Sequence, residues 1–243
     1  MFPALYDAHH RLYNEDLPFW LDLAKQQKGL VLELGCGTGR VLLPLAQAGI
    51  RMVGLDNDLD MLDYLRSRLP TALSPAPLLF AGEITRFHLG MEFTLIILPC
   101  NTWSTLSRVQ RLQALECIRA HLLPGGLFVV SIPGPDLLTS LPARSDPLIE
   151  EHCLHPLDGS PVQVSSGWRR GRRHFTVTWH YDNLLADGSV RRITARVRHD
   201  LASAQEYQQE LRNAGLALQA VYGDFERSPY TSDAQELVLV ASR

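Results

Sequence analysis

The chain has 243 residues, of which 46% are hydrophobic and 20% are charged, a balance typical of a globular protein with a full core. Its net charge of -3 gives no overall attraction to nucleic acid or to anionic membranes. There is no run of roughly 18 apolar residues and no signal-peptide pattern at the N-terminus. The four cysteines are widely spaced without a CxxC pair, which favours a cytoplasmic location.

Short apolar runs alternate with helical patterns in the first half of the chain. Asp16 is placed to cap a first helix, residues 16–27, with Pro18 in its first turn. Pro44 falls inside a later helix, where we expect a distortion. The expected strands are residues 30–34, 52–55, 78–80, 93–98 and 127–132, and the helices between them are residues 40–48, 59–69 and 108–122. Apolar strands separated by helices indicate a parallel sheet that helices cover on both faces.

The alternation of strands and helices breaks after Pro133. Residues 133–161 resemble a loop, and three segments with period-two alternation follow. They are residues 162–168, 174–181 and 190–197. A hairpin signal, Asp187-Gly188, separates the last two. A capping-box pattern from Ser203 to Glu206 opens a helix that ends at Gly215. The final strands, residues 216–222 and 236–241, have no helix between them, so we expect them to pair antiparallel.

These patterns predict an α/β fold with a seven-stranded, mostly parallel, doubly wound sheet of Rossmann-like type whose last strand is antiparallel, plus a small inserted antiparallel sheet. We expect residues 1–133 and 200–243 to form the core and residues 134–199 to form the inserted sheet as a lid. Phe175, Val177, Trp179 and Tyr181 share one face of that sheet. This aromatic stripe indicates either core packing or a homodimer interface.

The most informative segment is a glycine-rich loop between a strand and a helix, residues 31–40, with the sequence VLELGCGTGR. Glycines let the backbone turn sharply and approach a ligand closely, and the following helix offers free N–H groups. A dinucleotide loop would need glycine or alanine where Arg40 stands. Glu33, just before the loop, is a poor neighbour for a pyrophosphate but suits an ammonium group. The loop therefore argues against NAD.

The second strand ends at Asp56, a position from which a carboxylate can accept both hydroxyls of a ribose. Asp58 is better placed to cap the helix that follows. The glycine loop with Glu33 and Asp56 at these spacings resembles the class I methyltransferases that depend on S-adenosyl-L-methionine (SAM), of the small-molecule type. The resemblance covers residues 30–132 well and the C-terminal hairpin more loosely.

This resemblance implies SAM as the cofactor and assigns roles around it. Glu33 would reach the ammonium group, Asp56 would hold the ribose, and Leu98, at the end of the fourth strand, would lie near the sulfonium. The residues beside the adenine would come from the segments after the second and third strands. Met61 is one of them, although it is nearly as well explained as part of the helix core. Tyr13 is similar to a tyrosine that closes over SAM in small-molecule methyltransferases. The full set of expected cofactor contacts is Tyr13, Glu33, Gly35, Cys36, Gly37, Gly39, Asp56, Asn57, Met61, Gly82, Glu83, Ile84 and Leu98.

We expect the substrate to contact Asn101, Trp103 and His180, because loops and insertions vary most among such enzymes. The expected reaction moves the SAM methyl group to an N or O atom of a small molecule by in-line displacement, with no catalytic residue assigned. Two alternatives stay open: an RNA methyltransferase that uses the arginine turn at residues 169–173, and a non-catalytic SAM-binding regulatory protein. Nucleic acid is disfavoured by the acidic net charge, and the histidines lack the spacing of metal ligands.

Overall fold

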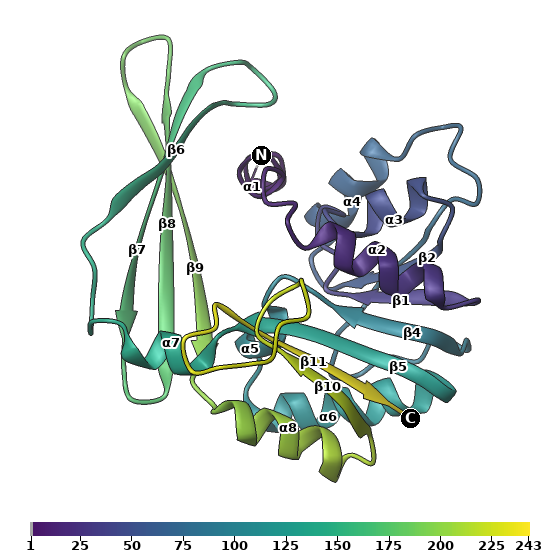
Figure 1. Ribbon diagram of the computed structural model, residues 1–243. Helices are drawn as coiled ribbons and strands as arrows, with labels where there is room; N and C mark the ends of the chain where they lie inside the picture. Colours follow the sequence, from purple (N-terminus) through teal and green to yellow (C-terminus); the bar gives the residue numbers. More distant parts are fainter. Residues whose placement is uncertain (1) are drawn as a thin grey trace.

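In a computed structural model, which describes residues 2–243, the chain is built around a seven-stranded sheet with the order β10-β11-β5-β4-β1-β2-β3 (Figure 1). Strand β11 is antiparallel to both β5 and β10, and the other neighbouring strands run parallel. The predicted sheet with an antiparallel last strand is confirmed. The strands are β1 (Leu30–Leu34), β2 (Arg51–Asp56), β3 (Leu78–Ala81), β4 (Phe93–Leu98), β5 (Leu122–Pro133), β10 (Ala217–Tyr222) and β11 (Glu236–Ser242).

Helices cover both faces of this sheet (Figure 1). Helices α2 (Leu17–Gln26), α3 (Leu42–Gln47) and α4 (Leu59–Arg68) pack on one face with Val31 of β1. Helices α5 (Thr102–Thr105), α6 (Arg108–His121) and α8 (Ala204–Asn213) pack on the other face with Leu32 and Leu34. Successive side chains of a strand point to opposite faces, which is why the central strands β1 and β4 are apolar at nearly every position. Within residues 2–243, none of the helices combines the length and the apolar composition that a membrane span requires.

A second, four-stranded antiparallel sheet stands beside the first, with the order β6-β7-β8-β9 (Figure 1). Its strands are β6 (Leu148–Leu154), β7 (Pro161–Arg170), β8 (His174–Leu184) and β9 (Val190–Asp200). Helix α1 (Phe2–His10) packs on it: Leu5 joins Val162, Val164 and Tyr181 in a small apolar cluster. Tyr181 of the aromatic stripe is therefore core.

The segment 133–161 differs from its predicted loop, because it contains helix α7 (Pro135–Ser140) and strand β6. Strand β6 lies at the edge of its sheet and most of its side chains are exposed, so the sequence has little apolar alternation there. The other three predicted strands of the inserted sheet are confirmed, and each is three residues longer than predicted.

Local signals at the helix ends were confirmed in part. Asp58 caps α4 by accepting the N–H of Met61, and Ser203 forms the predicted capping box with Glu206. Helix α3 begins only at Leu42, so Pro44 falls in its first turn, where a missing N–H costs little, and not in the expected helix interior.

The cap prediction at Asp16 was wrong. This residue has a helical backbone, and its side chain makes no capping hydrogen bond. Its carboxylate is buried and serves tertiary contacts instead, with the indole N–H of Trp20 donating to Oδ2 at 2.9 Å and Arg40 bound beside it.

Candidate active site

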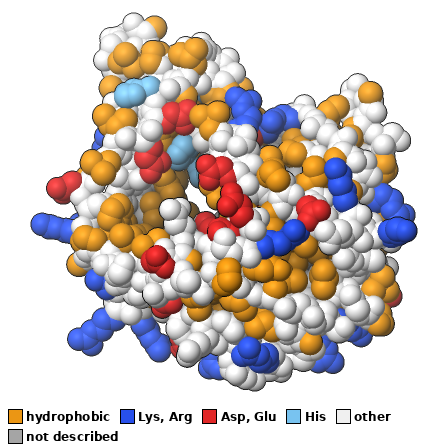
Figure 2. Space-filling model, viewed as in Figure 1, with side chains coloured by type: hydrophobic (Ala, Val, Ile, Leu, Met, Phe, Trp, Pro, Cys, Tyr) orange, Lys and Arg blue, Asp and Glu red, His pale blue; other side chains and the backbone are white. Residues whose placement is uncertain are grey.

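A cavity of about 960 Å³ lies between the carboxyl ends of the parallel strands and the four-stranded sheet. Its walls come from the glycine loop, the loop after β4, helix α1, strands β6, β8 and β9, and the loop between β10 and β11. Figure 2 shows acidic side chains gathered around this hollow on the surface of the molecule. In open α/β sheets, ligands bind at the carboxyl ends of the strands, so the cavity stands where a ligand is expected.

The glycine loop holds the carboxylate of Asp56 at the end of β2. The N–H of Gly37 donates to Oδ2 of Asp56 at 2.7 Å, and the N–H of Asp58 donates to Oδ1 at 2.9 Å. At Gly39, φ is +85°, and an added Cβ would lie 2.4 Å from Cδ1 of Leu65, so this position needs glycine for both conformation and space. Burial raises the pKa of Asp56. The carboxylate is thus oriented by backbone groups before any ligand arrives.

Glu33 is almost completely buried at the end of β1, with 2% of its surface exposed, and it lines the cavity. Its Oε2 atom has no hydrogen-bond partner among residues 2–243. Burial raises the pKa of this carboxyl well above its ordinary value. An unpaired buried polar group costs about 1–3 kcal/mol, and more when it is charged. A bound ammonium group would recover that cost, so Glu33 fits a ligand that carries one.

Arg40 joins the N-terminal segment to the loops of the sheet. Its guanidinium donates to both carboxylate oxygens of Asp16, at 2.7 and 2.6 Å, and to the carbonyl of Tyr13 at 2.8 Å. It also lies 2.9 Å from Sγ of Cys100, at the end of β4. Sequence reasoning used Arg40 only to exclude a dinucleotide loop and missed this role. Its position directly after the last glycine of the loop was the available signal.

The predicted adenine contacts lie together beside the cavity. The amide of Asn57, after β2, donates to Oε1 of Glu83, after β3, at 3.3 Å. The N–H of Gly82 donates to the carbonyl of Asp56 at 2.9 Å. Met61 is 8% exposed, and Ile84 packs on the core of the large sheet. The fold therefore brings these residues into one neighbourhood next to Asp56, outside the walls of the cavity itself.

The end of β4 carries two consecutive residues in the left-handed region, Cys100 with φ 61° and Asn101 with φ 63°. Such strained conformations cluster at functional sites. Asn101, for which we predict a contact with the substrate, lines the cavity. The side chain of Leu98 is fully buried in the core, so only its backbone stands at the strand end.

Two predicted substrate contacts do not fit the structure. Trp103 is fully buried and its ring packs against Phe128 in the core, so it does not face the cavity. His180 lies on the opposite face of β8 from Trp179, because side chains alternate along a strand, and it bonds Thr194 at 3.0 Å. Trp179, from the same strand, lines the cavity instead.

His199, near the end of β9, lines the cavity and was not predicted as a site residue. The hydroxyl of Ser104 donates its one hydrogen to the carbonyl of Asn101 at 2.8 Å, so Nδ1 of His199, 2.9 Å from the same oxygen, must be the donor to it. Burial lowers the pKa of His199 to about 4. The imidazole is therefore neutral at pH 7 and its Nε2 is left as an acceptor.

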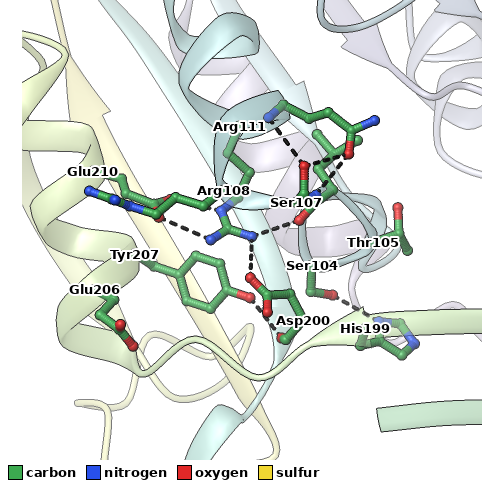
Figure 3. Close-up of polar contacts among 12 residues, drawn as sticks. Ser104, Thr105, Ser107, Arg108, Arg111, His199, Asp200, Glu206, Tyr207 and Glu210 are labelled. Atoms are coloured by element: carbon green, nitrogen blue, oxygen red, sulfur yellow. Dashed lines mark hydrogen bonds and ion pairs between the residues drawn. The ribbon is translucent and has the colours of Figure 1, made fainter. Parts of the chain in front are cut away.

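The residue after His199 anchors the four-stranded sheet to the core, as Figure 3 shows. Arg111 of α6 donates to Asp200 at 2.9 Å and to both carboxylate oxygens of Glu210 on α8, at 2.7 and 2.9 Å. Its guanidinium also lies over the ring of Tyr207. This buried network fixes the end of β9 and so the position of His199.

Helix α1 supplies the wall on the other side. The rings of Tyr6 and His10 stack with centroids 4.0 Å apart, and both line the cavity. Nδ1 of His10 donates to the carbonyl of Tyr6 at 3.0 Å, which leaves Nε2 as an acceptor. Burial and the neighbouring His9 lower the pKa of His10 to about 4. Tyr13, for which we predict a contact with SAM, lines the cavity, and the guanidinium of Arg40 lies over its ring.

Comparison with known proteins identifies this arrangement. Residues 31–126 match the family model described as a methyltransferase domain. The chain carries a methyltransferase domain and has the class I fold of SAM-dependent methyltransferases. The segment matched contains the glycine loop, Asp56 and the end of β4. The predicted family and its cofactor, SAM, are thus confirmed, and the unpaired carboxyl of Glu33 and the oriented carboxylate of Asp56 fit this ligand.

One solved structure shares the whole fold, and two relatives are similar in sequence over most or part of the chain. A SAM-dependent methyltransferase from Clostridium acetobutylicum ATCC 824 superposes with a TM-score of 0.82 at 13% identity, covering 98% of each chain. The cypemycin N-terminal methyltransferase of a Streptomyces species is 26% identical over 88% of this chain and 82% of its own length. A dTDP-3-amino-3,6-dideoxy-alpha-D-glucopyranose N,N-dimethyltransferase from Streptomyces fradiae is 35% identical, but over 41% of this chain and 38% of its own length.

Proposed function

We propose that this methyltransferase transfers the methyl group of SAM to an amine nitrogen of a small molecule. The observation that carries the proposal is the charge of the cavity. Among residues 2–243, eight carboxylic side chains line it, and the arginine that faces them is Arg40, already paired with Asp16. The eight are Glu15, Asp16, Glu33, Glu150, Asp224, Glu226, Asp233 and Glu236. A cleft lined by one sign of charge concentrates ligands of the opposite sign, so it favours an ammonium compound.

The same charge disfavours the nucleic-acid alternative. Polyanions bind to positive surfaces, and the acidic cavity would repel phosphate groups near the reacting atoms. In the arginine turn, Nε of Arg170 donates to the carbonyl of Leu141 at 2.8 Å, so this side chain already has a partner within the chain. Two relatives described above act on amines according to their names, an N-terminal methyltransferase and a sugar N,N-dimethyltransferase, which supports nitrogen as the acceptor.

Bound SAM supplies an electrophilic methyl group with a good leaving group, so the protein needs no covalent nucleophile. The tasks of this chain are to position the amine in line with the methyl group and to exclude water. The neutral imidazoles of His10 and His199 each offer Nε2 to the cavity as an acceptor for an N–H of the amine. We propose that Glu33 and Asp56 hold the cofactor, and that Asn57 and Glu83 meet its adenine.

We further propose that the four-stranded sheet covers the acceptor pocket. Glu150, Trp179, Val197 and His199 from this sheet line the cavity opposite the glycine loop. Pairing of two subunits through its exposed face stays a prediction. A cytoplasmic location also stays a proposal, supported by the four cysteines, which are all unpaired.

The test is methyl transfer from labelled SAM to matched acceptors. The panel contains primary amines, from ethylamine to amino sugars, and the alcohol that corresponds to each. It also contains a tripeptide with a free N-terminus and total RNA. We expect transfer to at least one amine and none to its matched alcohol. Transfer to alcohols alone, or salt-sensitive transfer to RNA, would refute the proposal. Asp56→Ala serves as a cofactor control and should weaken SAM binding by about 1–3 kcal/mol.

A further inference from the structure

Two buried carboxyl oxygens without a hydrogen-bond partner belong to glutamates that line the same cavity. Among residues 2–243 they are Oε2 of Glu33 and Oε2 of Glu236. The ammonium group of SAM accounts for the first. Nothing in the cofactor's expected position accounts for the second, because Glu236 begins β11, on the far side of β5 from β4.

The position of Glu236 suits an acceptor molecule. Glu236 pairs with Pro133, and Ser131, two residues earlier on β5, also lines the cavity. Neighbouring strands lie about 4.8 Å apart, so the start of β11 stands about 10 Å from the end of β4, where we expect the reacting groups beside Cys100 and Asn101. A glutamate side chain and one amine nitrogen fill a gap of that size.

The surroundings of Glu236 favour the binding of a cation. The charged and titratable groups near its carboxyl are Asp16, Arg40 and Tyr13. Arg40 is bound by both oxygens of Asp16, so it is not free to pair with Glu236. Burial, with Asp16 adding to it, raises the pKa of Glu236 to about 8. The α-ammonium group of a peptide has a similar pKa, so a proton can pass from such a group to Glu236 at little cost. An alkylammonium group, with a pKa of about 10.4, gives up its proton less readily.

We propose that Glu236 is the residue that binds the acceptor's ammonium group and takes its proton before methyl transfer. The inference rests on the proposed amine methylation. Ionised Glu236 pairs with the ammonium, and one N–H proton moves to Oε2. The nitrogen's electron pair then forms the bond to the methyl carbon, while the electrons of the C–S bond stay on sulfur. The proton on Oε2 leaves to solvent as the methylated ammonium departs, which restores the carboxylate.

The neutral histidines do not replace this role. With pKa values of about 4, His10 and His199 accept hydrogen bonds but hold a proton from an ammonium group poorly. Exposed Glu15 and Glu226 attract cations from the rim, where water screens them. Glu236 combines a solvent-excluded oxygen with a place beside the reacting groups.

The experiment compares Glu236→Gln with Glu116→Gln, which makes the same chemical change on the exposed side of α6. Calorimetry measures SAM affinity, and initial rates from pH 6 to 10 are taken with the primary amines that the parent protein methylates. We expect both variants to bind SAM within about twofold of the parent. For Glu236→Gln, kcat/KM should fall at least about 100-fold, and the ionisation near pH 8 should vanish from the pH profile.

Three results would overturn the inference. Equal amine kinetics in Glu236→Gln and Glu116→Gln would refute the role of Glu236 but leave the proposed function standing. A large loss of SAM affinity in Glu236→Gln would assign this carboxyl to the cofactor. A parent protein that methylates alcohols and no amine would remove the proposed function, and the inference with it.

Discussion

Replacing Arg40 with methionine tests whether its ion pair with Asp16 holds the N-terminal wall of the cavity. The Arg40 side chain is 11% exposed and that of Asp16 is 1% exposed. Removing one partner of a buried pair typically costs about 3–5 kcal/mol, because it leaves an uncompensated buried charge. In a domain of this size, 1 kcal/mol corresponds to about 2–4 °C in Tm, so Tm should fall by about 6–20 °C. Thermal unfolding and urea titration measure the loss.

A matched control removes an exposed arginine from a similar ion pair. Arg66 lies 2.7 Å from Asp63 on α4, and both side chains are exposed to solvent. Arg66→Met should cost less than about 0.5 kcal/mol. Adding Asp16→Asn to Arg40→Met should recover part of the lost stability, since neither residue of the pair is then charged. An Arg40→Met protein that melts within about 2 °C of the Arg66→Met protein would refute this reasoning.

Three further changes test other parts of the structure. The raised pKa of Glu236 means that the folded state keeps a proton that the unfolded state loses between pH 4.5 and about 8. Glu236→Gln should therefore be as stable as the parent near pH 4 and more stable at pH 9, by at most about 5 kcal/mol. Urea titrations in which the stability difference between the two proteins does not change with pH would contradict this. Arg111→Met should lower the free energy of unfolding by about 3–5 kcal/mol, and Arg108→Met, at an exposed arginine, by less than about 1 kcal/mol. Equal losses of stability in the two variants would contradict the role of the buried network. Gly39→Ala should weaken SAM binding at least about tenfold in calorimetry, because of its strained φ and the close contact it would create; an unchanged affinity would show that the loop adapts.

Local patterns made the fold and the cofactor loop predictable. Glu33, the glycines and Asp56 lie within 24 residues, and each stands at or just after the end of a strand whose apolar run is visible in the sequence. The antiparallel last strand followed from a connection too short for a crossover. The capping box at Ser203 is a four-residue signal that needs no tertiary information.

Residues whose role depends on distant partners were not predictable in this way. Asp16 looked like a helix cap because its partner Arg40 lies 24 residues away. Glu236 and His199 became site residues only when β11 and β9 were placed beside the cavity. Trp103 was wrongly expected at the substrate, because the sequence does not show which way α5 turns its side chains after the left-handed residues at the end of β4.

The prediction that His180 contacts the substrate was wrong for a related reason. Period-two alternation separates the two faces of β8, but it does not say which face meets the cavity. That was decided by helix α1, whose packing on Tyr181 and Val164 places Trp179 toward the site and His180 away from it. The sequence of α1 carries no strong signal for this contact.

The central claim is that one cavity holds SAM and an ammonium-bearing acceptor on two different glutamates. A crystal structure of the protein with S-adenosylhomocysteine and an amine that it methylates tests this most directly. We predict the cofactor's ammonium within hydrogen-bond distance of Oε2 of Glu33, its ribose on Asp56, and the acceptor nitrogen within hydrogen-bond distance of Oε2 of Glu236. A structure in which Glu33 and Glu236 both stay without a partner, or in which the acceptor binds outside the cavity, would contradict the account.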